Sequence, residues 1–274
     1  MGTIPYEPFD EDLLSGLGSD CKVIASASAG YNEFDVDWMT SAGIYFCNTV
    51  DAVSEATADM AMFLILAAVR NTTIAEKQAR GGKWKAGLTP SQDPVGKKLG
   101  IVGLGSIGKY LALKAKAFNM QIYYHNRHRL PEDEERKYGA TYCSSLNDLL
   151  STSDVISLHT PLNAATTGLI SHKEFEATKD GAFLINTARG AVVNEAAMID
   201  ALEGGKLRRV GLDVFEDEPN INEYFMKSDK VVIQPHMGGL TESAFAKSQK
   251  ECLENIRAYF ERGVPNSPVN DPKR

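Results

Sequence analysis

The second half of the chain alternates short apolar runs with segments of helical periodicity. Runs such as 155–158 and 183–185 are almost continuously apolar, as expected for strands that are covered on both faces. The pattern predicts strands at 99–103, 121–124, 155–158, 182–186, 209–213 and 231–234, and helices at 106–118, 146–151, 171–177 and 195–203. Such alternation predicts an α/β fold with a doubly wound parallel sheet.

The two ends of the chain show a different pattern. Strand-like runs at 22–25 and 44–47 flank a short helical stretch near 34–41, and a long helix is predicted to begin near Glu55. A last long helix, about 241–262, is expected to return to the N-terminal region.

These two patterns predict two domains. The smaller one is discontinuous and is expected to contain residues 1–53 and 241–274. The larger one, with the alternating pattern, is expected to contain residues 54–240.

Composition narrows the classes of protein that remain. The chain has 274 residues with 43% hydrophobic and 24% charged residues, which is ordinary for a globular protein. The net charge of −7 argues against nucleic acid as the main partner. The four cysteines are far apart, which favours free thiols in a reducing compartment over disulfides or a zinc site.

No feature of the sequence predicts a membrane or targeting segment. The longest apolar run, 60–69, is too short to span a bilayer and predicts a buried helix. The N-terminal region is acidic and lacks a basic leader, so a cytoplasmic protein is expected.

A glycine-rich turn lies where the first strand of the larger domain meets its helix. Gly103, Gly105 and Gly108 follow strand 99–103 and open helix 106–118. In this context the spacing allows a tight turn, a close approach of a pyrophosphate to the backbone, and close packing of the helix. The order strand, glycines, helix, strand predicts a Rossmann-type dinucleotide site rather than a turn that binds nothing.

The residues after the second strand bear on the choice of cofactor. Sites for NAD commonly place an acid there to hold the ribose 2′-hydroxyl, but residues 123–129 read YYHNRHR. Arg127 and Arg129 could hold a 2′-phosphate through charge-assisted hydrogen bonds, each worth about 1.5–3 kcal/mol. The sequence therefore favours NADP(H), with NAD(H) as the alternative. A plainer interpretation is that both arginines pair only with the acids at 132–135.

Three polar side chains stand just beyond apolar strands: Arg189, Glu218 and His236. Ligands bind at the carboxyl ends of strands in open α/β sheets. A guanidinium suits the carboxylate and carbonyl of a 2-oxo acid, and a histidine can give a proton to the developing alkoxide. Glu218 would orient that ring and favour its protonated form. Each residue alone could be structural, but together they predict reduction of a 2-oxo acid by a nicotinamide cofactor.

From about Lys22 to its C-terminus the chain resembles the D-isomer-specific 2-hydroxyacid dehydrogenase family. The shared motifs are the glycine-rich turn, NTARG at 186–190, DVFxxEP at 213–219 and PHxG at 235–238. The stretch 124–131 looks most like fungal-type glyoxylate/hydroxypyruvate reductases. The resemblance implies an NAD(P)-dependent dehydrogenase that reduces glyoxylate or hydroxypyruvate, with Arg189, Glu218 and His236 as its catalytic residues.

The resemblance also implies binding residues and a partner. The implied cofactor-binding positions are Gly103, Gly105, Ser106, Ile107, Gly108, Asn126, Arg127, Arg129, His159, Pro161, Thr166, Thr187, Ala188, Asp213, His236 and Gly238. Among them, Asp213 would contact the nicotinamide carboxamide. The implied substrate-binding positions are Ala27, Ser28 and Arg189. The family commonly dimerises through the long helix and the arm after it, so a homodimer is expected.

The chain departs from the family pattern at two places. The family usually has GxGYD where residues 28–32 read SAGYN. If the first of these positions needs a positive φ, Ser28 would be strained and the carboxylate pocket altered. Most of the family's N-terminal strand–helix region before the equivalent of Lys22 is absent. The flavodoxin-like substrate domain is therefore expected to be incomplete, with an unpaired sheet edge and reduced stability and activity.

Other functions stay open. One is the reduction of a larger 2-oxo acid, as in mandelate-type relatives. Another is a dinucleotide-sensing, non-catalytic corepressor, since such relatives keep the Arg, Glu and His, although the basic residues after the second strand argue against a sensor of NADH. The last is an inactive dinucleotide-binding remnant.

Overall fold

The computed structural model describes residues 8–17, 20–49 and 51–272. The chain forms two compact units, one of Met1–Ala56 with Gly239–Arg274 and one of Thr57–Gly238. These limits lie close to the division expected at 53/54 and 240/241. The assignment of the smaller unit to the substrate stays a prediction.

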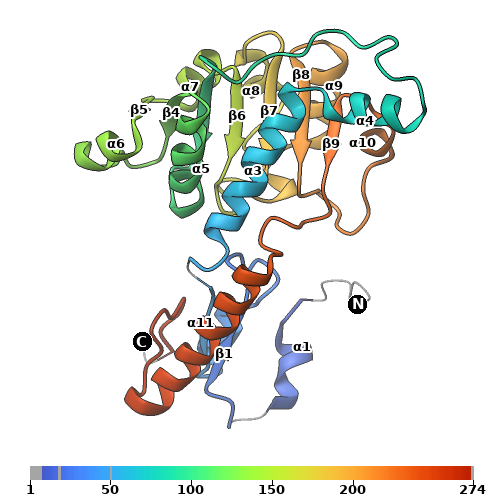
Figure 1. Ribbon diagram of the computed structural model, residues 1–274. Coiled ribbons are helices and arrows are strands. Elements are labelled where there is room, and N and C mark those ends of the chain that lie inside the picture. The colour runs from blue at the N-terminus through green and yellow to red at the C-terminus, as the bar shows by residue number, and fades with distance from the viewer. Residues whose placement is uncertain (1–7, 18–19, 50, 273–274) are drawn as a thin grey trace. The chain divides into compact units, whose positions relative to one another are not determined.

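The larger unit contains a seven-stranded parallel sheet with the order β5-β4-β3-β6-β7-β8-β9 (Figure 1). Its strands are β3 (Lys98–Val102), β4 (Gln121–His125), β5 (Ala140–Tyr142), β6 (Val155–Leu158), β7 (Ala182–Asn186), β8 (Leu207–Leu212) and β9 (Val231–Ile233). The strand order reverses between β3 and β6, and ligands bind at such a switch point beyond the carboxyl ends of the strands. The predicted doubly wound sheet is confirmed.

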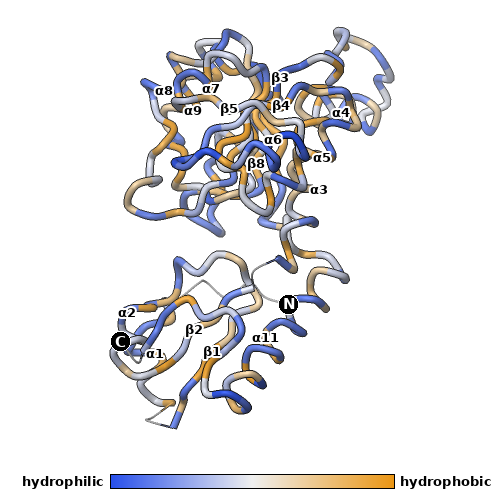
Figure 2. The backbone as a smooth tube through the Cα atoms, turned by 90° about the vertical axis from the view of Figure 1, so that its left-hand side faces the viewer, coloured by the Kyte–Doolittle hydropathy of each residue, from blue (hydrophilic) through white to orange (hydrophobic). Residues whose placement is uncertain are grey.

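Helices cover both faces of this sheet. They are α3 (Ser54–Val69), α4 (Thr72–Arg80), α5 (Ser106–Ala117), α6 (Glu132–Tyr138), α7 (Leu146–Thr152), α8 (His172–Ala177), α9 (Glu195–Glu203) and α10 (Glu223–Lys227). Alternate side chains of a strand point to opposite faces, so Ile101 packs in the apolar cluster with α3 and α5, while Val102 packs in the cluster with α7, α8 and α9. In Figure 2 the apolar segments gather in the interior of this unit.

Side-chain caps explain where several helices begin. Ser145 accepts a hydrogen bond from the Asp148 N–H, and Asn194 accepts one from the Ala197 N–H. Short polar side chains at this position satisfy a backbone donor that the helix leaves free. The observed starts at Leu146 and Glu195 agree with the predicted ones.

Five elements of the larger unit were not predicted: α4, β5, α6, α10 and the 3-10 helix η2 (Gly190–Val192). The strand β5 has only three residues, and α6 reads EDEERKY, which has no apolar stripe. The predicted arm at 81–90 contains no helix or strand.

The predicted buried helix at 60–69 is confirmed. Most apolar side chains of α3 are buried in the core, among them Leu64 and Ile65 at 0% exposure. Over the described ranges no single helix is both long and apolar enough to cross a membrane. Only α3 and α4 taken together, with a 70° bend between them, meet that criterion of length and composition.

The smaller unit holds a pair of parallel strands, β1 (Val23–Ala25) and β2 (Tyr45–Cys47). Its helices are α1 (Glu11–Leu14), α2 (Val36–Ser41) and α11 (Glu242–Arg262), with a 3-10 turn η1 (Ser15–Leu17). The outer side of β2 meets the C-terminal segment, because Val269 N–H donates to the Phe46 carbonyl at 2.8 Å. Within the part of the chain that the structure describes, β1 is paired on one side only.

Candidate active site

The glycine-rich turn has the shape that a phosphate-binding turn requires. Gly103 has φ +98°, and a Cβ there would lie 2.9 Å from the His159 carbonyl oxygen. A Cβ at Gly108 would lie 2.5 Å from the Gly103 carbonyl oxygen, whereas Gly105 faces open space. The turn opens α5 at Ser106 and Ile107. Free N–H groups and the helix dipole at such an end favour an anion.

A cavity of about 430 Å³ lies beside this turn. Seven predicted cofactor positions line it: Gly103, Gly105, Asn126, Arg127, His159, Pro161 and Thr166. The sequence analysis missed further lining residues: Val102, His125, His128, Leu146, Thr160, Asn163, Ala165 and Leu169. Except for Leu146, the first residue of α7, they come from the ends of β3, β4 and β6 and the loops that follow. Adjacency to a predicted position could have found Val102, His125, His128, Thr160 and Ala165.

The two candidate arginines have different surroundings. The Arg129 guanidinium is bound to Glu135, with Nε–Oε1 at 2.9 Å and a terminal nitrogen to Oε2 at 2.8 Å. Hydrogen bonds from Arg129 and Tyr124 hold the pKa of Glu135 at about 2. Arg127 is exposed and lines the cavity, and Arg129 does not. The geometry thus favours the ion-pair alternative for Arg129, and of the two arginines it is Arg127 that lines the cavity.

His159 supports a buried, polar ligand at this cavity. Its Nε2 lies 2.8 Å from Ser157 Oγ, and burial lowers its pKa to about 3, so the ring is neutral. Its Nδ1 is buried, as is Oγ1 of Thr160, which also lines the cavity, and neither atom has a hydrogen-bond partner within the described ranges; the same holds for Thr187 Oγ1, which lies after β7 and outside the cavity lining. Buried polar atoms without partners are rare. Together with the turn, they fit a bound dinucleotide.

The structure joins His236 and Glu218 directly. His236 Nδ1 lies 2.7 Å from Glu218 Oε2, and Glu218 Oε1 accepts a hydrogen bond from the Phe215 N–H at 2.9 Å. Burial would raise the pKa of Glu218, but the hydrogen bonds from His236 and Phe215 outweigh it and hold that pKa below its usual value. The carboxylate is therefore ionised and fixed on the ring.

Asp213 organises the loop that carries His236. Its fully buried carboxylate accepts hydrogen bonds from the Met237 N–H at 2.8 Å and the Gly238 N–H at 2.7 Å. Its carbonyl accepts one from the His236 N–H at 2.7 Å. Burial nevertheless raises the pKa of Asp213. His236 has φ +53°, a conformation that this loop imposes.

The turn that carries Arg189 packs against the backbone near Glu218 at the neighbouring residue, Gly190. A Cβ on Gly190 would lie 1.9 Å from the Phe215 carbonyl carbon, so the turn after β7 packs against the backbone that leads to Glu218. Asn186 shapes this turn by donating to the Arg189 carbonyl at 2.9 Å and accepting from the Ala188 N–H at 3.0 Å. The charge of Arg189 helps to lower the pKa of Glu218.

Ala27 and Ser28 belong to the smaller unit. Ser28 Oγ donates to the Gly30 carbonyl at 2.7 Å and lies 2.8 Å from Ser26 Oγ. Among the described non-glycine residues only Asn71, Trp84, Asn119 and His236 have a positive φ. Ser28 is not one of them, so the strain considered for this position does not arise.

The chain matches the family model described as D-isomer specific 2-hydroxyacid dehydrogenase, NAD binding domain, over residues 62–238. It is 61% identical over 274 residues to the dehydrogenase efuE of Hormonema carpetanum, covering all of this chain and 68% of that protein. It is 42% identical over 266 residues to the 4-methyl-2-oxopentanoate reductase A of Aspergillus oryzae, covering 97% and 80% of the two chains.

Solved structures agree with these matches. A glyoxylate reductase from Paecilomyes thermophila superposes with a TM-score of 0.90 at 42% identity, covering 96% of this chain and 79% of that one. The holo form of Rhodotorula graminis D-mandelate dehydrogenase superposes with a TM-score of 0.92 at 34% identity, covering 97% of this chain and 79% of that one. An NADPH-dependent glyoxylate/hydroxypyruvate reductase from Sinorhizobium meliloti, in complex with NADP and malonate, superposes with a TM-score of 0.87 at 30% identity. The match covers 96% of this chain and 82% of that one.

Proposed function

The chain belongs to the D-isomer-specific 2-hydroxyacid dehydrogenase family, and we propose that it reduces glyoxylate or hydroxypyruvate with NADPH as the preferred donor. The observation that carries this proposal is the hydrogen bond of 2.7 Å between His236 and Glu218 beside the Arg189 turn. Arg189, Glu218 and His236 follow β7, β8 and β9, and this arrangement supports a site made of a guanidinium, a carboxylate and an acid–base residue.

Each residue has a distinct part in the proposed reaction. The guanidinium of Arg189 binds the substrate carboxylate and polarises the carbonyl. A nicotinamide bound here would supply a hydride for the carbonyl carbon. His236 then gives its proton to the carbonyl oxygen, so that a 2-oxo acid, a hydride and a proton yield the 2-hydroxy acid. Glu218 holds Nδ1, which leaves Nε2 as the nitrogen that transfers the proton. The backbone amides of Ala27 and Ser28 are proposed to bind the substrate carboxylate.

The residues beside the cavity support NADPH rather than NADH. No acid stands at the end of β4 to hold a 2′-hydroxyl, and Arg127 lines the cavity there. The similar reductase from Sinorhizobium meliloti is described as NADPH-dependent and holds NADP. Arg127 is therefore proposed to bind the 2′-phosphate, and Arg129 is dropped from the proposed contacts because Glu135 holds it.

A larger 2-oxo acid is the second candidate substrate. The likeness to D-mandelate dehydrogenase and to 4-methyl-2-oxopentanoate reductase A favours it, because both names imply side chains larger than that of glyoxylate. A panel of glyoxylate, hydroxypyruvate, phenylglyoxylate and 4-methyl-2-oxopentanoate, each with NADPH and NADH, separates the candidates by kcat/KM. Binding of NADPH without turnover of any of these acids would favour the corepressor or remnant alternatives and overturn the proposal.

The role of His236 is tested in the same assay. His236→Ala is expected to lower kcat by about 10²–10⁴-fold, the contribution of a general acid. His172→Ala is the matched control, because His172 is an exposed histidine on α8 whose nearest acid, Asp200, is 3.9 Å away. A kcat for His236→Ala within about threefold of the unmodified protein would exclude the proposed role.

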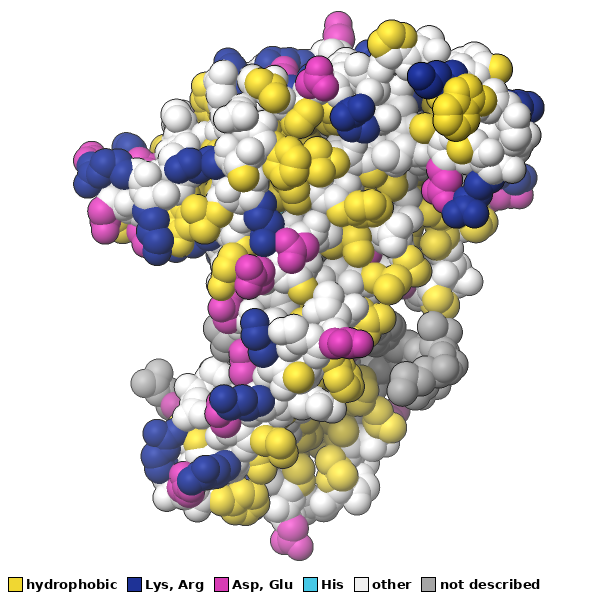
Figure 3. Space-filling model, in the orientation of Figure 1, with side chains coloured by type: hydrophobic (Ala, Val, Ile, Leu, Met, Phe, Trp, Pro, Cys, Tyr) yellow, Lys and Arg dark blue, Asp and Glu magenta, His cyan; other side chains and the backbone are white. Residues whose placement is uncertain are grey.

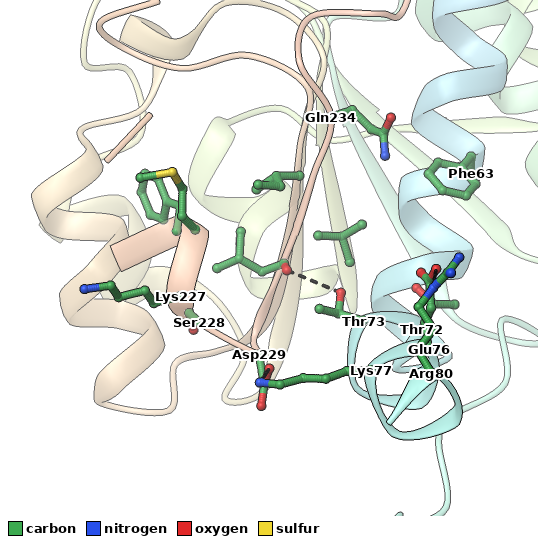
Figure 4. Close-up of a pocket in the computed structure, with 15 residues that line it drawn as sticks. Phe63, Thr72, Thr73, Glu76, Lys77, Arg80, Lys227, Ser228, Asp229 and Gln234 are labelled. Carbon is green, nitrogen blue, oxygen red and sulfur yellow. Dashed lines mark hydrogen bonds and ion pairs between the residues drawn. The ribbon is translucent and has the colours of Figure 1, made fainter. Parts of the chain in front are cut away.

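A homodimer through α3 and the arm is also proposed. A cavity of about 470 Å³ runs along the open edge of β9, between α4 and α10 (Figure 4). Phe63 and Met226 line it and are 49% and 56% exposed. Figure 3 shows further hydrophobic side chains at the surface near α4 and the arm, where Trp84 is 76% exposed. Acidic and basic groups, such as the Lys77–Asp229 pair at 3.0 Å, flank this face, so a second copy could complement it.

A further inference from the structure

A buried network lies next to the loop that carries Arg127. Tyr124, in β4, is fully buried, and its hydroxyl donates to Glu135 Oε1 at 2.6 Å. The same hydroxyl oxygen accepts a hydrogen bond from the Leu130 N–H at 3.0 Å. Glu135, in α6, also holds Arg129 through both of its carboxylate oxygens. Groups from β4, the loop after it and α6 therefore form one connected unit.

This network holds one end of the loop, and the phosphate turn holds the other. At the start, Asn126 Oδ1 accepts a hydrogen bond from the Leu104 N–H at 2.7 Å. At the end, Leu130 N–H is bound by Tyr124. Arg127 and His128 lie between these two attachments, and both line the cavity beside Gly103 and Gly105. Few conformations remain for a loop this short with both ends fixed.

Arg129 is turned away from the cavity by the same network. Its guanidinium lies over the ring of Tyr142, 5.6 Å from the centroid, in addition to its two bonds to Glu135. Burial, together with the hydrogen bond to Glu135, raises the pKa of Tyr124 to about 12. Its hydroxyl therefore keeps its proton at neutral pH and remains a donor.

We propose that Tyr124, Glu135 and Arg129 are positioning residues that hold Arg127 and His128 ready for a 2′-phosphate and so set the preference for NADPH over NADH. The proposal rests on the proposed NADPH preference and adds the structure that maintains it. None of the three positioning residues lines the cavity. Their effect on the cofactor therefore passes through the loop, by fixing it before the ligand arrives.

Binding of two fragments separates this effect from catalysis. We would measure the Kd of 2′,5′-ADP (adenosine 2′,5′-bisphosphate) and of AMP by isothermal titration calorimetry, because the two differ only in the 2′-phosphate. Tyr124→Phe removes one hydroxyl, and the Kd of 2′,5′-ADP is expected to rise about three- to tenfold, the effect of losing one hydrogen bond. The Kd of AMP should not change, and with substrate the KM for NADPH should rise while kcat stays constant.

Tyr224→Phe is the matched control for Tyr124→Phe. Tyr224 also donates its hydroxyl to a glutamate, Glu203, but it lies on α10 and does not line this cavity. Neither Kd should change in this variant. An equal loss of AMP and 2′,5′-ADP binding in Tyr124→Phe would show a general structural role and overturn the proposal.

A double-mutant cycle tests whether the network acts through Arg127. Arg127→Met is expected to raise the Kd of 2′,5′-ADP about 10- to 100-fold, and Glu135→Gln about three- to tenfold. In the Arg127→Met background Glu135→Gln should add little, because the side chain that it positions is gone. Additive effects of the two substitutions on the Kd of 2′,5′-ADP would refute the proposal. Tighter binding of 2′,5′-ADP by Glu135→Gln, with Arg129 released to contact the phosphate, would also refute it.

The double-mutant cycle also distinguishes a failure of the proposed NADPH preference from a failure of the proposed positioning network. If the unmodified protein binds AMP as tightly as 2′,5′-ADP and Arg127→Met changes neither, the NADPH preference itself is wrong. If Arg127→Met has its expected effect but neither Tyr124→Phe nor Glu135→Gln does, only the positioning network is wrong. Thermal unfolding of each variant shows whether it is folded. If Tyr124→Phe does not fold, Glu135→Gln tests the positioning network in its place.

Discussion

Replacing Glu218 by glutamine tests the hydrogen bond between Glu218 and His236 in the proposed site. The Glu218 carboxylate accepts two hydrogen bonds, from His236 Nδ1 at 2.7 Å and from the Phe215 N–H at 2.9 Å. A glutamine has one carbonyl oxygen and one NH₂ group. In Glu218→Gln the NH₂ group therefore faces one of these two donors, unless the ring of His236 changes its tautomer. Either outcome disturbs the nitrogen that holds the transferable proton.

The expected loss follows from the strength of a charge-assisted hydrogen bond. Such a bond contributes about 1.5–3 kcal/mol, which corresponds to a fall in kcat/KM of about 10- to 150-fold. Glu218 does not line the cavity beside the glycine-rich turn, so the affinity for the dinucleotide should not change. The loss should therefore occur in kcat with the Kd of NADPH unaltered.

The stability of Glu218→Gln should also respond differently to pH. The folded pKa of Glu218 is below its unfolded value of about 4.3. The ionised carboxylate thus stabilises the fold above that unfolded pKa, and this contribution is lost as the pH falls through the lower, folded pKa. The difference in Tm between the unmodified protein and Glu218→Gln should be largest near neutral pH and shrink below pH 4.

Glu216→Gln is the matched control, because Glu216 is an exposed glutamate two residues away. The assay is steady-state oxidation of NADPH with the best substrate of the panel, followed from pH 5 to pH 9. A kcat/KM for Glu218→Gln within threefold of the unmodified protein would refute the assigned role of the carboxylate. So would an equal loss in Glu216→Gln.

Two further substitutions test the packing around the site and the proposed dimer. In Gly190→Ala the new Cβ would meet the Phe215 backbone at 1.9 Å, so both Tm and kcat should fall, by at least the cost of about 1–3 kcal/mol typical of overpacking. Gly16→Ala, with no atom within 4 Å of its new Cβ, should leave unchanged both Tm in scanning fluorimetry and kcat in the steady-state assay. Phe63→Glu should convert a dimer to a monomer in light scattering, whereas Leu113→Glu, at a 46% exposed position on α5, should not. A monomeric unmodified protein would show that the proposed dimer is wrong.

The strands of the larger unit could be predicted because burial on both faces leaves a strong pattern. The four residues of β6 and the five of β7 are all buried, and their sequences are almost entirely apolar. No such pattern marks β5, which lies at the edge of the sheet and pairs only with β4. The helix α6 was also missed, because its single buried acid, Glu135, is stabilised by partners that lie elsewhere in the chain.

In the candidate site too, the residue types could be predicted from the local sequence, but their contacts depend on residues elsewhere in the chain. Arg127 and Arg129 are two residues apart and looked equivalent as ligands for a phosphate. They differ because the backbone after Asn126 turns back toward α6 and brings only Arg129 to Glu135. The sequence left both choices open, since the position of that glutamate depends on a helix that its own pattern does not reveal.

The order of the strands explains why residues so far apart in sequence were recognisable as one site. The strands β7, β8 and β9 are neighbours in the sheet and are consecutive along the chain. Arg189, Glu218 and His236 each follow one of them, so parallel pairing alone carries all three to the same edge. The glycine-rich turn follows β3, which is three strand spacings from β8, or about 14 Å. Only an extended ligand can contact both the turn and Asp213 after β8. A dinucleotide has that form, with its phosphates at one end of this span and its reactive ring at the other.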